Sequence, residues 1–263
     1  MFSGFSQNSA HDRYTAKDLA GIILDFYKFL TTLHYKEADL KIPPPGGWPD
    51  FPPACYSELK SPKVIELMKH MLYFSHAWTA IHYKSGLIDY LSMNPKWFTE
   101  LDWREEDEEF IDSEGDPFDP RDVLFLAWGH ESGGRDLVLD VRGGEIIEIS
   151  IRMDTKDGED INSYLENLKD EFRSFKLIPR TGCITYEAHD VEETEEEITE
   201  DDVAAQESEF GTDLDWQYVR QVYRQHGWPD AFRQEEAEAA IDRLEERIFD
   251  TRGGWETDDP YSD

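Results

Sequence analysis

The chain has 263 residues and a formal net charge of −33, because 59 Asp and Glu face 26 Lys and Arg. Such a surface repels nucleic-acid phosphates and anionic lipid heads, so it argues against binding to either and favours basic protein partners. Aromatic residues make up 13%, which is too many for a fully disordered chain, and we expect a folded body. The sequence shows no apolar run of about 20 residues, no secretory signal and only two isolated cysteines, Cys55 and Cys183. A cytoplasmic protein is expected, with nuclear access as an alternative.

Two helices are predicted in the first third of the chain. Thr15 and Asp18 have the spacing of a capping box, and apolar residues then recur at helical spacing as far as Leu33. Ser61 followed by Pro62 is typical of a second helix start, because proline fits the first helical position. Residues Met1 to Tyr14 are predicted to form a loose tail.

Residues 42–53 form a proline-rich stretch between these helices, with six prolines and two glycines. Proline lacks a backbone donor and restrains the residue before it, so the stretch cannot be helical. A rigid loop that lays Trp48 and Phe51 over the first helix is favoured over an exposed proline motif for recognition.

The middle of the chain predicts a meander of strands followed by a helix. Residues 123–127 form an apolar run that suits a buried strand, and 137–141 and 145–151 read as two further strands. The short turns between them favour antiparallel pairing. Apolar residues from Ile161 to Phe172 then recur at helical spacing.

The C-terminal part is dominated by charge. Between Thr181 and Tyr218 there is no Lys or Arg, and residues 187–209 hold twelve acids, so like-charge repulsion should keep much of this segment open. Helical spacing returns beyond it. The predicted organisation is a flexible tail (1–14), an α+β domain with a mostly antiparallel sheet flanked by helices (15–186), an acidic, partly disordered linker (187–213), a helical segment (214–250) and a flexible acidic tail (251–263).

Motifs for catalysis or metal binding are mostly incomplete. His70, His76 and His82 are six residues apart, which does not place them on one helix face, and no zinc-ligand spacing occurs. Residues 154–160 superficially resemble a calcium loop, yet the ligand positions that Gly158 would imply fall on residues without carboxylates, so a cap and turn before the next helix is favoured. Ser132 has only half of a nucleophile-elbow motif, and the glycines around it favour a turn with positive φ. No cofactor or metal is predicted.

The middle of the chain resembles the SUKH superfamily, which includes fungal cell-wall-signalling regulators and bacterial toxin-immunity proteins. Four stretches carry the resemblance. Three are predicted strands with their turns, Val123-Leu-Phe-Leu-Ala-Trp-Gly129, Gly134-Arg-Asp-Leu-Val-Leu-Asp140 and Gly143-Gly-Glu-Ile-Ile147. The fourth is a predicted helix, Ile161-Asn-Ser-Tyr-Leu-Glu-Asn-Leu168. The resemblance implies an α+β fold with a mixed or antiparallel sheet flanked by helices, and a non-catalytic scaffold that binds other proteins. The chain is also similar to uncharacterised fungal proteins around residues 42–48 and 223–229.

The sequence therefore predicts an interaction or regulatory protein, with Trp128, His130 and Arg135, near one end of the meander, as candidates for a partner-binding rim. The alternative is that these three residues are ordinary loop and core residues with no role in binding. Two other hypotheses stay open. One is a hydrolase-type enzyme that uses carboxylates with one of His70, His76, His82 or His130. The other is an acidic mimic of nucleic acid, which requires acids along one face at phosphate-like spacing.

Overall fold

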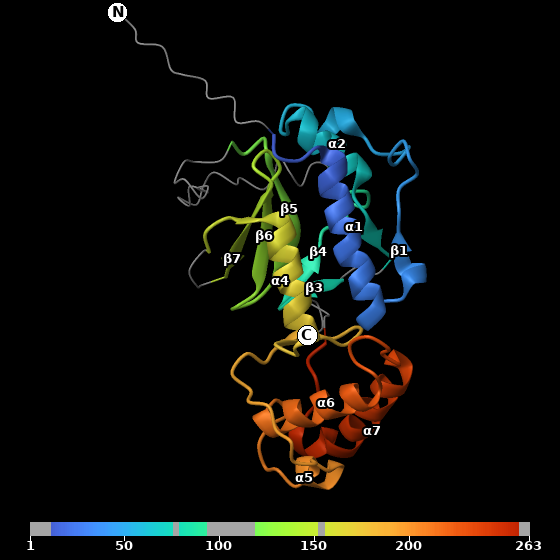
Figure 1. The fold of residues 1–263 in the computed structure, drawn as a ribbon, viewed down its shortest axis with the longest axis vertical. Helices are drawn as coiled ribbons and strands as arrows, with labels where there is room; N and C mark the ends of the chain where they lie inside the picture. Colours follow the sequence, from blue (N-terminus) through green and yellow to red (C-terminus); the bar gives the residue numbers. More distant parts are fainter. Residues whose placement is uncertain (1–11, 76–78, 94–118, 152–155, 258–263) are drawn as a thin grey trace, which may run out of the picture.

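The computed structural model describes residues 12–75, 79–93, 119–151 and 156–257. Figure 1 shows an elongated molecule in which a sheet with covering helices forms one end and three C-terminal helices form the other. The C-terminal part of the chain returns to the junction between these two ends. The α+β class predicted from the sequence is confirmed.

The central sheet has six strands in the order β3-β4-β5-β6-β7-β8, all paired antiparallel. The strands are β3 (Ala80–His82), β4 (Ser85–Leu87), β5 (Val123–Gly129), β6 (Arg135–Asp140), β7 (Glu145–Ser150) and β8 (Glu159–Asp160). The predicted meander is therefore confirmed in β5 to β7. Almost every residue of β5 and β6 is buried, which explains why their sequences are continuous apolar runs and not alternating patterns.

Two two-stranded ribbons lie outside this sheet. The short strands β1 (Leu40–Lys41) and β2 (Tyr73–Phe74) pair with each other, as do β9 (Leu177–Ile178) and β10 (Tyr186–Glu187). Short 3-10 helices, η1 (Glu37–Asp39) and η2 (Pro53–Cys55), also occur in the first part of the chain.

The helices are α1 (Ala16–Leu33), α2 (Pro62–His70), α4 (Ile161–Arg173), α5 (Glu200–Ala204), α6 (Asp213–Gln225) and α7 (Gln234–Arg252). The predicted capping box opens α1, with Asp18 N donating to Thr15 Oγ1 at 3.1 Å. Ser61 caps α2 as predicted. Asp160 caps α4 by accepting from the backbone N–H groups of Asn162 and Ser163, so the cap expected before this helix is confirmed.

Helices α1 and α4 pack against each other beside the sheet (Figure 1). The rings of Phe29 and Phe172 lie 6.3 Å apart between them, and Lys169 of α4 forms an ion pair with Asp25 of α1. The larger of two apolar clusters among the described residues runs from α1 through the sheet to Trp216 and Ile241 of the C-terminal helices.

The proline-rich loop packs against the end of α2 and against β2, while the prediction that Trp48 and Phe51 cover α1 stays a prediction. Trp48 Nε1 donates to the carbonyl of Met71 at 2.7 Å, and its ring lies 6.2 Å from that of Tyr73. Phe51 stacks on Tyr56 with centroids 5.4 Å apart. The loop therefore fixes the C-terminal end of α2, and its aromatic residues are used in packing.

The acidic segment 187–213 differs from the predicted open linker, because it contains α5 and packs on α6 and α7. Ile198 and Val203 are buried in a small cluster with Leu244 and Ile248. Like-charge repulsion within the segment is offset by bases that lie outside it in the sequence. These bases form ion pairs with its acids: Arg220 and Arg224 with Glu193, and Arg247 with Glu200 and Asp201.

The two predicted tails are also partly packed. Tyr14 donates a hydrogen bond to Asp160 at 2.7 Å. At the other end Trp255 is buried, and Ile184 N donates to the carbonyl of Glu256 at 3.0 Å. Residues 1–11 and 258–263, which belong to the same two predictions, lie outside the described residues, as do the aromatic group and acidic loop that the sequence places in 97–116.

Candidate functional site

A pocket of about 120 Å³ lies where the turn between β3 and β4 meets the C-terminal helical part of the chain. We call it the aromatic pocket. It is lined by Tyr83, Lys84, Ile184, Tyr186, Phe210, Trp216, Gly254, Trp255 and Glu256. These residues come from four separate stretches of the sequence, so the pocket exists only when the two ends of the molecule are docked.

Aromatic rings make up most of the pocket wall. Tyr186 stacks on Trp216 with centroids 3.7 Å apart, and Trp255 meets Trp216 edge-on at 5.0 Å and 77°. Phe210 approaches Trp216 in a similar edge-on geometry at 5.3 Å. Offset and edge-to-face contacts of this kind are those that aromatic quadrupoles favour, so the rings hold one another in place.

The two indole N–H groups of the pocket are bonded to the protein itself. Trp216 Nε1 donates to the carbonyl of Gly211 at 2.9 Å, and Trp255 Nε1 donates to the carbonyl of Ile184 at 2.8 Å. Because these donors are engaged and the two tryptophans are only 2% and 8% exposed, they offer a guest no N–H group and little ring surface.

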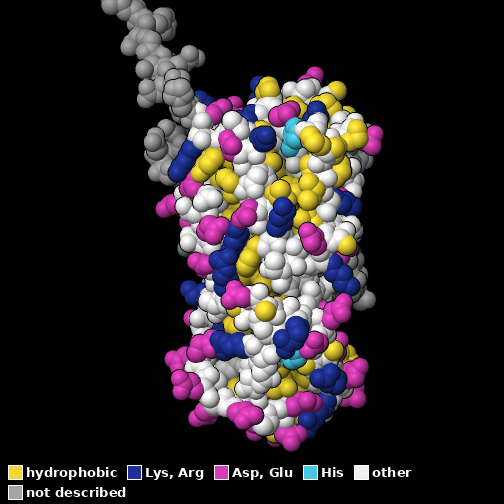
Figure 2. All heavy atoms as spheres, turned by 45° about the vertical axis from the view of Figure 1, so that its right-hand side comes forward, with side chains coloured by type: hydrophobic (Ala, Val, Ile, Leu, Met, Phe, Trp, Pro, Cys, Tyr) yellow, Lys and Arg dark blue, Asp and Glu magenta, His cyan; other side chains and the backbone are white. Residues whose placement is uncertain are grey.

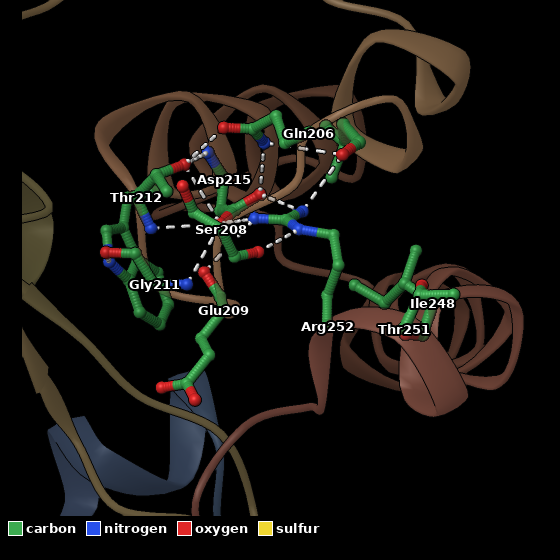
Figure 3. Close-up of polar contacts among 11 residues, drawn as sticks. Gln206, Ser208, Glu209, Gly211, Thr212, Asp215, Ile248, Thr251 and Arg252 are labelled. Atoms are coloured by element: carbon green, nitrogen blue, oxygen red, sulfur yellow. Dashed lines mark hydrogen bonds and ion pairs between the residues drawn. The ribbon is translucent and has the colours of Figure 1, made fainter.

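A buried ion pair between Asp215 and Arg252 organises this wall (Figure 3). The Arg252 guanidinium also donates to the carbonyls of Val203, Ser208 and Glu209, so all five of its N–H groups have an acceptor. We call this arrangement the Asp215–Arg252 clamp. It ties the chain around α5 and the start of α6 to the last residue of α7.

The clamp positions three of the pocket's rings. Trp216 directly follows Asp215 in α6, and Trp255 lies three residues after Arg252. Phe210 N donates to the carbonyl of Arg252 at 2.9 Å. Loss of the clamp would therefore release Trp216, Trp255 and Phe210 together.

Lys84 and two carboxylates form the charged rim of the pocket. Lys84 Nζ lies 2.8 Å from Glu131 Oε2 and 4.0 Å from Glu256 Oε2, and both glutamates are largely exposed. Burial acts to lower the pKa of Lys84, but its contact with Glu131 outweighs this and the pKa is raised. The lysine is therefore charged at neutral pH, and its charge is already paired.

The three predicted rim residues, Trp128, His130 and Arg135, lie at the same end of the sheet as this pocket. His130 N donates to the carbonyl of Lys84 at 2.9 Å, and the Arg135 guanidinium lies 5.8 Å from the ring centre of Tyr83. Trp128 sits opposite Gly86 of β4 and packs against the ring of Phe125 at 5.7 Å. None of the three lines the pocket.

Arg135 is buried behind the turn and does not stand at an open rim. Its Nε lies 3.0 Å from Glu148 Oε1 and its Nη2 lies 2.8 Å from Glu187 Oε1. Its role in this arrangement is to support Tyr83 and β10 from the interior.

Glu148 is the centre of a buried polar network on β7. It is 2% exposed, accepts a hydrogen bond from Tyr164 at 2.9 Å and lies 3.8 Å from His82 Nε2. Burial raises the pKa of Glu148, but His82, Lys156 and Tyr164 together bring it below its ordinary value. Burial lowers the pKa of His82 to about 4, so this imidazole is neutral at pH 7.

The other histidines considered from the sequence do not join this network. His70 lies at the C-terminal end of α2 and contacts Glu66 of its own helix, and His130 lies in the loop after β5. Burial lowers the pKa of His130. His76 lies outside the described residues. Within the ranges that the structure describes, no group of His, Cys, Asp and Glu is arranged to hold a metal ion.

The residues predicted for the rim lie at the same end of the sheet as the pocket, but none of the residues that line the pocket was predicted. Trp216 follows the segment predicted as an acidic linker, and Trp255 lies within the segment predicted as an acidic tail. The signal that could have found them is the set of Trp and Phe residues within 210–216 and 253–257, since large aromatic residues are rarely placed in open acidic chain.

Compared with known proteins, the chain matches no family model, no curated protein and no solved structure. In the described part of the chain, none of the helices has the length and apolar character that crossing a bilayer requires.

Proposed function

We propose that this protein is a non-catalytic interaction or regulatory protein that binds basic segments of other proteins. The observation that carries the proposal is the aromatic pocket with a carboxylate rim on a chain of net charge −33. Aromatic residues with a polar handle are the residues that most often anchor protein interfaces. The charge supplies long-range attraction for a basic partner.

The distribution of charge supports a protein partner. Figure 2 shows Asp and Glu side chains spread along the whole length of one face, interspersed with Lys and Arg. This face carries no continuous acidic stripe of the kind that a nucleic-acid mimic needs, so binding of basic protein segments is the better-supported proposal. We assign the protein to the cytoplasm, with the nucleus as the alternative.

The buried histidine favours binding over catalysis. A general base must reach the proton that it abstracts and needs a pKa near the working pH. His82 is 4% exposed, its pKa is lowered to about 4, and it does not line the aromatic pocket. The contact between His82 and Glu148 is therefore better explained as a satisfied interior pair.

The SUKH resemblance is consistent with this proposal. Its strand and helix stretches correspond to β5, β6, β7 and α4, which form one continuous part of the fold. We propose a SUKH-like scaffold, in which the aromatic pocket is formed by the turn beside this part and by the C-terminal helices.

Calorimetric titration with a short Lys/Gly/Ser peptide, and with its Glu/Gly/Ser counterpart, tests the proposed function. We expect the basic peptide to bind at low salt and to lose affinity as salt rises, because the attraction between exposed charges is screened. The acidic peptide should not bind. Equal binding of both peptides, or no binding of the basic peptide at low salt, would contradict the proposal.

A further inference from the structure

We propose that the aromatic pocket receives a methylated lysine side chain, with its trimethylammonium head against the partly exposed rings of Tyr83 and Tyr186, in the pocket that the buried Trp216 and Trp255 also line. This inference rests on the proposed function, because it names the chemical group of the basic partner that the pocket takes. Quaternary ammonium groups are recognised by aromatic faces through the ring quadrupole.

The size of the pocket limits its guest to one small group. Its volume of about 120 Å³ is well below the roughly 300 Å³ at which pockets for drug-sized ligands begin. A nucleotide or a folded cofactor does not fit such a space. A single side-chain head group does.

The charges around the pocket favour a cation over an anion. Lys84 is the lining residue with a positive charge, and it is already paired with Glu131 and Glu256. Glu187, which follows Tyr186, is paired with Arg135. An anionic guest would face the rim carboxylates. The rings already attract cations of the chain itself, since Lys84 Nζ lies 5.6 Å from the centre of the Tyr83 ring and the Arg180 guanidinium lies 5.8 Å from that of Trp255. A cationic guest would share these ring faces and gain from the carboxylates.

The hydrogen-bonding groups of the pocket distinguish among three possible guests: a proline-rich peptide, an unmodified lysine and a trimethyllysine. A proline-rich peptide is usually held in an aromatic groove with help from donors to its carbonyls, but both indole N–H groups are bonded to Gly211 and Ile184. An unmodified lysine ammonium is strongly hydrated and has three donors that need acceptors. A trimethylammonium head has no hydrogen-bond donors. It can therefore carry its charge into a ring-lined pocket without leaving a buried donor unpaired.

Three peptides with the same Lys/Gly/Ser sequence provide the test, and calorimetry provides the readout. One carries a central lysine, one a central trimethyllysine, and one the neutral isostere in which carbon replaces the quaternary nitrogen. With the wild-type protein we expect the trimethyllysine peptide to bind about tenfold more tightly than either of the others. Equal affinity of the trimethyllysine and neutral peptides would overturn the inference, because it would mean that the pocket recognises apolar volume alone.

Protein variants locate the effect. Tyr83→Ala removes a ring from the turn side of the pocket, and we expect it to abolish the preference for trimethyllysine. Phe249→Ala is the matched control, because Phe249 is 66% exposed on α7 and does not line the pocket. A preference that survives Tyr83→Ala would overturn the assignment to this pocket. Should Tyr83→Ala fail to fold, the three-peptide comparison on the wild-type protein still decides the question.

The same titrations separate failure of the inference from failure of the proposed function. Equal, salt-dependent binding of all three peptides would refute the methyllysine pocket and leave a binder of basic segments. No binding of any peptide at low salt would refute both. Free choline tests the source of the group, and choline that binds as tightly as the trimethyllysine peptide would overturn the assignment to a protein side chain.

Discussion

The Asp215 carboxylate and the Arg252 guanidinium form a two-point ion pair in which neither side chain is exposed to solvent. Arg252 Nη1 lies 2.8 Å from Asp215 Oδ1, and Nη2 lies 2.7 Å from Oδ2. Asp215 also accepts from the backbone N–H groups of Gly211 and Thr212, both at 2.9 Å. The Asp215 carboxylate therefore accepts hydrogen bonds both from Arg252 and from the backbone at the start of α6. Because these contacts fix the start of α6 to the end of α7, they hold the side of the aromatic pocket that Trp216 and Trp255 form.

Removal of one partner from this clamp should be costly. We expect Asp215→Ala to lower the free energy of unfolding by about 3–5 kcal/mol, since it leaves the Arg252 charge buried without a counter-charge. Urea unfolding followed by tryptophan fluorescence measures the loss. The double variant Asp215→Leu/Arg252→Met removes both charges and should recover part of the stability. A single variant as stable as the wild type would contradict the role of the clamp.

Arg135 and Lys156 offer a matched comparison, because both lie close to Glu148 Oε1, at 3.0 and 2.8 Å. Arg135 is buried, whereas the Lys156 side chain is 65% exposed. We expect Arg135→Met to destabilise the fold by about 3 kcal/mol or more, since the change removes a buried partner of a buried carboxylate. Lys156→Met should have little effect, because solvent already screens that pair. Equal effects in thermal or urea unfolding would show that Arg135 is not the interior support described above.

Two buried histidines should make the protein less stable in mild acid. Burial lowers the pKa of His34 to about 3 and that of His82 to about 4, while an unfolded histidine titrates near 6.5. Between these values the unfolded chain binds protons that the folded chain does not, so stability falls as pH decreases from 6.5. The expected loss is about 2 kcal/mol for each histidine between pH 7 and pH 5.

His34→Phe tests this pH dependence directly. The His34 ring packs 4.3 Å from that of Tyr35 and 5.8 Å from that of Phe172, so phenylalanine matches the surroundings without titrating. The difference in unfolding free energy between pH 7 and pH 5 should shrink by about 2 kcal/mol in this variant. An unchanged difference would mean that His34 is protonated equally in both states.

Two glycines should respond to alanine in opposite directions. Gly144 has φ +75°, and a Cβ there would lie 2.3 Å from Tyr14, so Gly144→Ala should cost roughly 1–3 kcal/mol. Gly21 is exposed inside α1 with no atom near the added Cβ, so Gly21→Ala should stabilise the protein by roughly 0.5–1 kcal/mol. Melting temperatures of the two variants check the signs. Two shifts of the same sign would contradict this description of the turn and the helix.

Local signals in the sequence were sufficient for helices α1, α2 and α4 and for strands β5 to β7, whereas strands β1 to β4 were not predicted. The capping box of Thr15, the Ser61-Pro62 start and the apolar run from Val123 each depend on near neighbours, and each appears in the structure as predicted. A turn with positive φ was also predicted at the glycines around Ser132, and Gly133, together with Glu131, has positive φ in the structure.

The C-terminal part was harder because its stability depends on distant partners. Counting acids in residues 187–209 suggested repulsion, but Glu193 meets Arg220 and Arg224, which follow the segment in sequence. Trp255 reaches the pocket through a hydrogen bond to Ile184, 71 residues away in the chain. No local pattern encodes such contacts, so the candidate site could be placed at one end of the sheet but not assembled.

The most direct test of the central claim is a titration of the nitrogen-15-labelled protein with the basic Lys/Gly/Ser peptide, followed through the indole N–H signals of Trp216 and Trp255. We expect both signals to shift and to saturate together with the calorimetric binding curve, because the peptide inserts a cationic side chain beside these rings. Binding that moves other signals and leaves both indoles unchanged would contradict it.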